Sequence, residues 1–262
     1  MSVLDEIVKK TRERIEQKKR EVPLEEIKKR AENFAPTLND FPFEKALRAA
    51  GDIAFICEVK RASPSKGIIA AHFPYVDIAV DYQAAGAAAI SVLTEPFYFK
   101  GDDSYLSEIS EAVDIPLLRK DFTVDTYMIY ETKILGASAV LLICSILNRE
   151  TLAEYIELSH SLGLSALVET HDENEVNAAL SAGAQIIGVN NRNLKTFEVD
   201  IRASERLRPL VPKDKIFISE SGIQTPADIE KLRKIGTNAA LIGETLMRSP
   251  DKKSELRRLK GG

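Results

Sequence analysis

The sequence predicts an α/β protein, a single (β/α)8 TIM barrel with a helical extension at its amino terminus. Eight short β-rich runs alternate with helical segments after residue 52. Glycines at the ends of alternate helices recur at separations of 50, 47 and 53 residues, about two strand–helix units each. The length of 262 residues is typical of a barrel that forms one domain, which we expect to span residues 1–262.

Residues 1–51 are expected to form the helical extension. An apolar stripe at helical spacing marks the first helix: Leu4, Ile7, Val8 and Ile15. Ser2 is placed to cap it, with Asp5 three residues later in a loose capping box. Two shorter helices are predicted at residues 24–31 and 43–50, the second ended by Gly51.

The first helix carries several basic residues among its apolar ones: Lys9, Lys10, Arg12, Arg14, Lys18 and Lys19. They alternate with the apolar stripe, so we expect them to form a solvated face. The alternative is that this helix is a lid over the mouth of the barrel.

Eight strands are predicted at residues 53–60, 88–93, 116–119, 139–143, 165–169, 185–190, 216–220 and 239–242. Strands joined by helices pair in parallel, and closure into a barrel leaves no exposed edge strand. A glycine precedes every second strand: Gly86, Gly136, Gly183 and Gly236. Each can end the preceding helix in a left-handed conformation, which costs glycine little conformational energy. A closed barrel is therefore favoured over an open sheet.

Composition narrows the range of functions. With 44% apolar and 29% charged residues the chain is globular, and a net charge of −4 gives no reason to expect nucleic acid as a partner. No apolar run approaches the length of a membrane span, and no secretory signal is recognisable, so we expect a soluble cytoplasmic protein. Cys57, Cys144 and the three histidines show no metal-ligand spacing. We expect no metal site, and surface or capping roles for the histidines.

Polar side chains gather at the carboxyl ends of the predicted strands, where the active sites of such barrels lie. They are Glu58, Lys60, Lys120, Glu169, Asn190 and Glu220. Because strand residues alternate between faces, Glu58 and Lys60 share one face and Cys57 takes the other. Ammonium and carboxylate groups that meet at one mouth would pair and shift each other's pKa values, as acid–base catalysis requires. A purely structural salt-bridge cluster is the alternative.

A phosphate site is predicted beside this cluster. Ser221 and Gly222 follow the seventh strand and Gly243 follows the eighth, the usual place for phosphate in a barrel. Small residues there let backbone N–H groups approach phosphate oxygens, helped by the dipole of the helix after Gly243. Arg192 and the loop that contains Ser63 could add a guanidinium and hydroxyls.

Six segments together resemble the indole-3-glycerol phosphate synthase family. They are CEVKRASPSKG at 57–67, SVLTE at 91–95, LRKDF at 118–122, GVNNRNL at 188–194, SESGI at 219–223 and LIGE at 241–244. The resemblance covers nearly the whole chain, including the helical extension. It implies conversion of 1-(2-carboxyphenylamino)-1-deoxyribulose 5-phosphate to indole-3-glycerol phosphate, carbon dioxide and water, in tryptophan biosynthesis. No cofactor is implied, and other enzymes of this pathway are conceivable partners.

The resemblance also implies roles for the site residues. Lys120 is the general acid that protonates the developing oxygen of the sugar ketone, and Glu169 is the candidate base. Glu58 and Lys60 form a coupled pair that assists dehydration. The remaining positions are expected to orient or bind the substrate. Asn190, Glu220 and Ser221 orient hydroxyls and ring; Ser63, Arg192, Ser221, Gly222 and Gly243 hold phosphate; Phe99 and Phe122 flank the anthranilate ring.

Two other functions compete with this one. Phosphoribosylanthranilate isomerase, a related phosphate-binding barrel, would place a reactive cysteine at the end of the first strand and an aspartate at the sixth. Here the sixth strand ends in Asn190, and Cys57 faces the helices by strand parity. A non-catalytic sugar-phosphate binding barrel would keep Arg192 but would have no need of Lys120 or Glu169.

Overall fold

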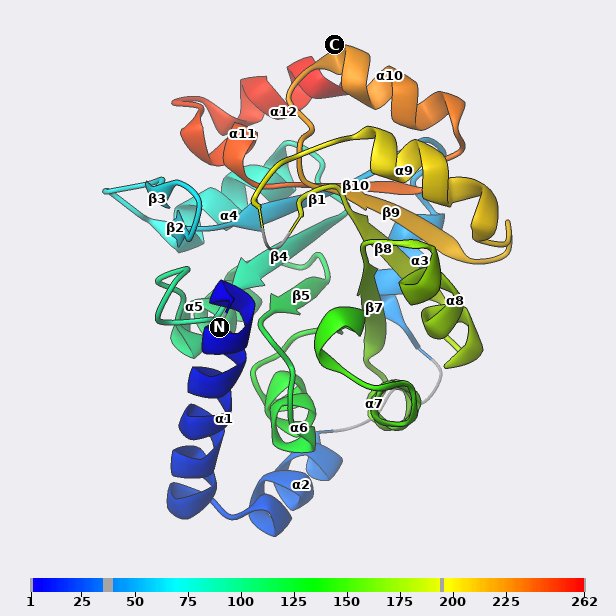
Figure 1. Ribbon diagram of the computed structural model, residues 1–262. Helices are drawn as coiled ribbons and strands as arrows, with labels where there is room; N and C mark the ends of the chain where they lie inside the picture. Colours follow the sequence, from blue (N-terminus) through cyan, green and yellow to red (C-terminus); the bar gives the residue numbers. More distant parts are fainter. Residues whose placement is uncertain (1, 35–39, 194–195, 262) are drawn as a thin grey trace.

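Eight parallel strands close into a barrel in the computed structural model, which describes residues 2–34, 40–193 and 196–261 (Figure 1). The order around the barrel is β1-β10-β9-β8-β7-β6-β5-β4, and the pairing of β1 with β10 closes it. The barrel strands are β1 (Ala54–Val59), β4 (Ala89–Leu93), β5 (Leu117–Lys120), β6 (Ala139–Ile143), β7 (Ser165–Thr170), β8 (Ile186–Asn190), β9 (Ile216–Glu220) and β10 (Ala239–Ile242). The predicted fold is confirmed, and every predicted run overlaps its strand, with β5 and β7 each extending one residue beyond the predicted end.

Two elements at the mouth were not predicted as strands. Within the expected loop after β1, β2 (Ala62–Ser63) and β3 (Gly67–Ile68) form a small antiparallel hairpin. Gly67 has a φ of +63°, which a residue with a side chain rarely adopts. The hairpin therefore carries Ser63 on a short turn beside the barrel mouth.

The helices surround the barrel (Figure 1). They are α4 (Tyr75–Ala84), α5 (Asp103–Ala112), α6 (Thr126–Ile134), η1 (Cys144–Ile146), α7 (Arg149–Ser161), α8 (Glu173–Ser181), α9 (Arg202–Leu207), η2 (Arg208–Leu210), α10 (Pro226–Lys234), α11 (Glu244–Arg248) and α12 (Lys252–Lys260). The four repeated glycines all have positive φ, from +76° to +91°, as predicted for left-handed helix ends.

The core has an inner and an outer layer, because strand residues alternate between the barrel interior and the helices. Ile56 lies in the inner layer, whereas Cys57 lies among apolar residues in the outer layer and is fully buried. Phe43 and Leu47 of α3 (Pro42–Arg48) belong to the inner cluster and cover its end away from the mouth. The predicted orientation of Cys57 is confirmed.

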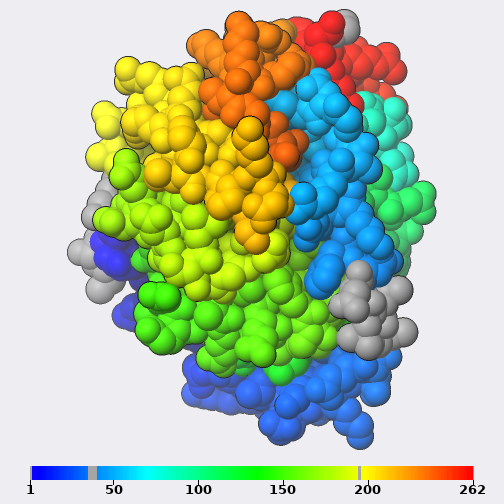
Figure 2. All heavy atoms as spheres, turned by 90° about the vertical axis from the view of Figure 1, so that its right-hand side faces the viewer, coloured from blue at the N-terminus to red at the C-terminus, as the bar shows by residue number. Residues whose placement is uncertain are grey.

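The first two helices, α1 (Val3–Glu21) and α2 (Leu24–Asn33), lie against α5 and α6 (Figure 1). Figure 2 shows their blue residues along the lower edge of the molecule, next to green residues from the middle of the chain. The capping box is confirmed: the Asp5 backbone N–H donates to Ser2 Oγ over 3.1 Å, and the Ser2 N–H donates to Asp5 Oδ2 over 2.8 Å.

The expectation of a solvated basic face on α1 is wrong for three residues. Arg14 pairs with Asp121 at 2.8 Å, and Lys19 pairs with Asp125 at 2.6 Å. Lys18 pairs with acidic residues of α5 and α6. The charges of α1 therefore bind it to the segments that follow β4 and β5.

Lys18 joins a partly buried group of charges that we call the arginine cluster: Lys18, Asp103, Arg119 and Glu131. Arg119 of β5 points outward and is only 1% exposed. Its Nη2 lies 2.6 Å from Asp103 Oδ1 and 2.6 Å from Glu131 Oε2. One guanidinium thus joins the barrel wall to α5 and α6, and through Lys18 to α1.

Candidate active site

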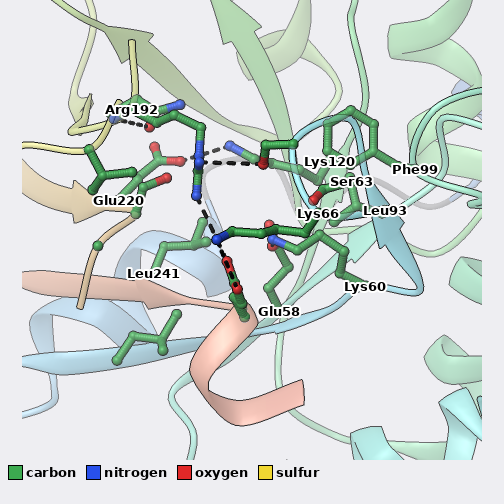
Figure 3. Close-up of a pocket in the computed structure, with 18 of the residues that line it drawn as sticks. Glu58, Lys60, Ser63, Lys66, Leu93, Phe99, Lys120, Arg192, Glu220 and Leu241 are labelled. Atoms are coloured by element: carbon green, nitrogen blue, oxygen red, sulfur yellow. Dashed lines mark hydrogen bonds and ion pairs between the residues drawn. The ribbon is translucent and has the colours of Figure 1, made fainter. Parts of the chain in front are cut away.

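A cavity of about 990 Å³ opens at the carboxyl ends of the strands. Figure 3 shows charged side chains from β1, β5 and β9 converging within it. Every site residue predicted from the sequence lines this cavity: Glu58, Lys60, Ser63, Phe99, Lys120, Phe122, Glu169, Asn190, Arg192, Glu220, Ser221, Gly222 and Gly243. These residues come from seven of the eight barrel strands or the loops after them, and Leu141 and Ile143 of β6 also line the cavity.

Lys120 is the centre of the charged group. Its Nζ donates to Glu169 Oε2 and to Glu220 Oε2, each over 2.7 Å. Asn190 Nδ2 donates to the other oxygen of Glu169 over 3.1 Å. The side chains of Glu169 and Glu220 are 4% and 3% exposed, so the ammonium and carboxylates interact largely out of water.

Burial and neighbouring charges shift the pKa values of Lys120, Glu169 and Glu220, and not all in the same direction. Burial alone would lower the pKa of Lys120, but the adjacent Glu169 and Glu220 carboxylates raise it above its usual value. Burial opposes ionisation of Glu169 as well, yet Lys120 and then His171 lower its pKa to about 2. Burial raises the pKa of Glu220 to about 7, which the Lys120 ammonium offsets only partly. The two carboxyl groups beside Lys120 therefore have pKa values shifted in opposite directions.

Glu58 and Lys60 form an ion pair from the same face of β1, as strand parity predicted. Gly243 makes room for them, because a Cβ at this position would lie 2.3 Å from Glu58 Oε1 and 2.9 Å from Lys60 Nζ. Gly188 does the same for Glu220, whose Oε1 would lie 2.2 Å from an added Cβ. These glycines allow charged side chains to lie directly over the backbone.

Arg192 lies at the other side of the mouth, pointing into the cavity with Lys66 (Figure 3). Its Nη1 donates to the Phe197 carbonyl over 3.1 Å and to Ser65 Oγ over 3.4 Å. Lys66 and Arg192 each lie 3.9 Å from a carboxylate oxygen of Glu244. Lys66 and Glu244 were not singled out from the sequence, although both lie within the motifs that carry the resemblance.

The chain turns sharply at Ser221 and Gly222, which have φ values of +68° and +83°. A serine with a left-handed φ is uncommon and costs conformational energy. Residues strained in this way are found preferentially at functional sites. Together with Arg192, Lys66 and the hairpin β2–β3, this turn makes one side of the cavity cationic and rich in small residues. Such a side fits a phosphate group.

Apolar side chains form another part of the cavity lining, which we call the apolar wall. The Phe99 and Phe122 rings lie with their centroids 6.0 Å apart, and Leu93, Leu141 and Leu241 line the same cavity. The Glu95 carboxylate, which is fully buried, accepts the backbone N–H groups of residues 97 to 99 and so fixes the loop that carries Phe99.

The first turns of α1 complete this wall, since Val3, Leu4 and Ile7 also line the cavity. The alternative of a lid at the mouth is thus the better description of this end of α1. The sequence did not single out these three residues as part of the site, because they belong equally to an amphipathic stripe.

His171 was expected on the surface or as a cap, and the first of these is wrong. Its side chain is 17% exposed and lies behind Glu169, with Nε2 3.5 Å from Glu169 Oε1. Its Nδ1 lies 3.0 Å from Glu175 Oε2 in the first turn of α8. His171 lies two residues beyond the predicted base and directly follows β7, so its position at the end of this strand could have singled it out.

Comparison with known proteins decides the family. The sequence model described as indole-3-glycerol phosphate synthase matches residues 4–259. The chain belongs to the indole-3-glycerol phosphate synthase family. Its similarity to the protein of that name from Ruminiclostridium cellulolyticum is 57% identity over 259 residues, covering 99% of each chain. The one from Lachnoclostridium phytofermentans is 53% identical over 268 residues, covering 98% of each.

Solved structures show likeness in fold alone. The 3-hexulose-6-phosphate synthase of Salmonella typhimurium matches with a TM-score of 0.65 at 15% identity, covering 80% of this chain and 97% of that one. A mutant tryptophan synthase α-subunit from Pyrococcus furiosus matches with a TM-score of 0.61 at 14% identity, covering 80% and 99%. The uncovered fifth of this chain is consistent with a barrel that carries an extension.

Family membership makes the chain a carbon–carbon lyase of tryptophan biosynthesis that acts on a small-molecule substrate. It decides against phosphoribosylanthranilate isomerase and against a non-catalytic binding barrel. The structure agrees with the first exclusion, because burial raises the pKa of the Cys57 thiol well above its usual value on the helix side of β1. Among the helices described, none is long and apolar enough to cross a membrane.

Proposed function

We propose that Lys120 is the general acid of the ring closure catalysed by this family, with the anthranilate carbon attacking the sugar ketone. The observation that carries the assignment is the position of Lys120 Nζ, 2.7 Å from two buried carboxylates in the cavity. An ammonium held there can protonate the ketone oxygen as negative charge develops on it. Its raised pKa keeps it charged throughout the neutral range.

Glu169 is the proposed base. A carboxylate with a pKa of about 2 is a weak base while Lys120 is an ammonium. When Lys120 gives its proton to the substrate, the charge that lowers the pKa of Glu169 disappears, and the carboxylate becomes more basic. Proton donation by one group thus prepares the other to accept the proton lost when the new ring double bond forms.

Decarboxylation and dehydration complete the reaction. Loss of carbon dioxide from the attacked ring carbon restores its aromatic character, and the hydroxyl formed from the ketone leaves as water. Glu58 and Lys60, paired at the edge of the cavity, are proposed to assist proton transfer in this last step. Asn190, Glu220 and Ser221 are proposed to orient the sugar hydroxyls and the reacting ring.

The substrate is proposed to lie across the cavity. Its phosphate is held by the cationic side, and its anthranilate ring lies on Phe99 and Phe122 of the apolar wall. The phosphate is held by these residues: Ser63, Arg192, Ser221, Gly222 and Gly243. A charge-assisted contact from Arg192 is the strongest single interaction expected there.

The test is to add 1-(2-carboxyphenylamino)-1-deoxyribulose 5-phosphate and follow indole fluorescence. The Lys120→Ala variant should turn over at least about 100-fold more slowly, the scale of losing a positioned acid. Lys215→Ala is the matched control, since Lys215 precedes β9 at the opposite end of the barrel and contacts Gln185. Turnover by Lys120→Ala within a few fold of the control would contradict the acid role.

Three wider expectations are part of the proposal. Residues 1–262 form one domain, with residues 1–51 as an extension that folds with the barrel. The ion pairs of Arg14 and Lys19 with the β5–α6 segment support this unit.

A location in the cytoplasm, and contacts with other enzymes of tryptophan biosynthesis, follow from the pathway. Co-purification from a cell that contains those enzymes would test the last.

A further inference from the structure

We infer that His171 is a positioning residue, which, through its own proton, controls how strongly Glu169 acts as a base. This inference rests on the proposed function of Glu169 and extends it to a residue outside the cavity. His171 is not among the described residues that line the cavity. It therefore acts through Glu169 and does not contact the substrate.

The contacts define a chain of three groups. Glu175 Oε2 accepts the backbone N–H of His171 over 2.8 Å and faces the ring Nδ1 at 3.0 Å. On the other side of the ring, Nε2 lies 3.5 Å from Glu169 Oε1. This Nε2 is buried and has no hydrogen-bond partner among the described residues. Glu175 thus fixes the ring so that its free nitrogen faces the base.

The ring has two states with opposite effects. Since the Glu175 carboxylate can only accept, the proton of the neutral ring lies on Nδ1, and the lone pair of Nε2 faces a carboxylate oxygen. In the imidazolium, Nε2 carries a proton and a share of positive charge toward that oxygen. A protonated His171 therefore stabilises the ionised form of Glu169, and a neutral His171 does not.

The surroundings favour the charged ring. Burial lowers the pKa of His171, but Glu175 of α8, Glu169 of β7 and Glu220 of β9 together raise it above 6.5. On η1, Cys144 contacts the Glu175 carbonyl and adds no charge, because burial raises the pKa of its thiol to about 12. The charge on His171 is thus set by three acidic groups from three elements.

A pH dependence follows from these contacts. Below the pKa of His171, Glu169 has two cationic neighbours, Lys120 and the imidazolium, and is a weaker base. As the pH rises through the pKa of His171, one of these charges is lost, and the proton affinity of Glu169 increases. The chemical step should therefore become faster across this range.

The experiment is single-turnover kinetics by indole fluorescence from pH 5.5 to 9, with enzyme in excess over the carboxyphenylamino-deoxyribulose phosphate. The wild-type rate constant should rise with the titration of His171. His171→Asn should react roughly three- to tenfold faster than wild type at pH 5.5, with the rates converging at pH 9. Titration of Glu220, whose pKa is about 7, occurs in both proteins and does not enter this ratio. His160→Asn, altered on α7 where the ring contacts Phe41, should keep the wild-type profile.

A second readout needs no turnover. The chain has three histidines, so the His171 ring is identified in NMR spectra by the signal missing from His171→Asn. Its titration midpoint should lie above 6.5 in the wild type and fall in Glu175→Gln and in Glu169→Gln. Equal midpoints in all three proteins would overturn the inference.

The kinetic arms separate the inference from the proposed function. If Glu169→Gln is severely impaired but His171→Asn keeps the wild-type pH profile, the inference fails and the base assignment stands. If Glu169→Gln reacts at nearly the wild-type rate, the proposed role of Glu169 fails, and the inference with it.

Discussion

Replacing Arg119 by methionine should destabilise the protein strongly, although Arg119 lies outside the cavity. The guanidinium is buried and pairs at 2.6 Å with both Asp103 and Glu131. Methionine is of similar length and fills much of the same space, so the loss is mainly of charge and hydrogen bonds. Lys18 is then the one cation of the arginine cluster left for two carboxylates.

The expected cost is about 3–5 kcal/mol, the range for removing one partner of a buried ion pair. Asp103 contributes to it, because burial alone would raise its pKa, and Arg119 followed by Lys18 lowers it to about 2. For a chain of this size each kcal/mol corresponds to roughly 2–4 °C in Tm, so Tm should fall by roughly 6–20 °C.

The measurement is the free energy of unfolding in urea at pH 7, followed by far-UV circular dichroism. Arg233→Met is the matched control, because Arg233 also pairs with two carboxylates, those of Asp52 and Glu230, but at the surface. Exposed pairs contribute about 1 kcal/mol or less. Equal losses in Arg119→Met and Arg233→Met would refute the reasoning that burial makes the arginine cluster costly to break.

Three further predictions concern the cavity. Arg192→Ala should raise KM roughly 10- to 150-fold, from a charge-assisted contact of about 1.5–3 kcal/mol, in steady-state assays with exposed Arg202→Ala as control; an unchanged KM would remove Arg192 from the phosphate site. The stability of Glu220→Gln relative to wild type should increase from pH 4 to pH 8, because burial raises the pKa of Glu220 to about 7 and ionisation of the wild-type carboxyl then opposes folding. Urea titrations measure this change, and a stability difference independent of pH would contradict it. Gly188→Ala should lower kcat roughly 10- to 100-fold with circular dichroism unchanged, since the added Cβ displaces Glu220 from its place 2.7 Å from Lys120.

The barrel could be predicted because its signal is local and repeated. Each strand is a short apolar run, and four of the helices before them end at a glycine that the structure places at positive φ. The site residues could be predicted for the same reason: once the strands are located, the residues at their carboxyl ends must meet. Lys120 and Glu169 are 49 residues apart in the chain and still form a hydrogen bond.

The docking of α1 could not be predicted in the same way. A lysine on an amphipathic helix has the same pattern whether it faces water or a carboxylate from a distant segment. The partner of Arg14 is 107 residues away, and that of Lys19 is 106 residues away, so no spacing along the helix reveals them. Such pairs depend on where an entire helix packs, which the barrel pattern does not determine.

Gly243 was predicted from the sequence for one property, and the structure shows a second one. From the sequence, a glycine after the eighth strand allows a phosphate to approach the backbone. In the structure the same missing side chain is also what allows Glu58 and Lys60 to lie against the backbone, at distances where a Cβ would collide with both. The distinction has chemical consequences, because a side chain at Gly243 would disturb the ion pair on β1 as well as any phosphate contact. A substitution at Gly243 would therefore not separate the proposed phosphate contact from the proton transfer proposed for Glu58 and Lys60.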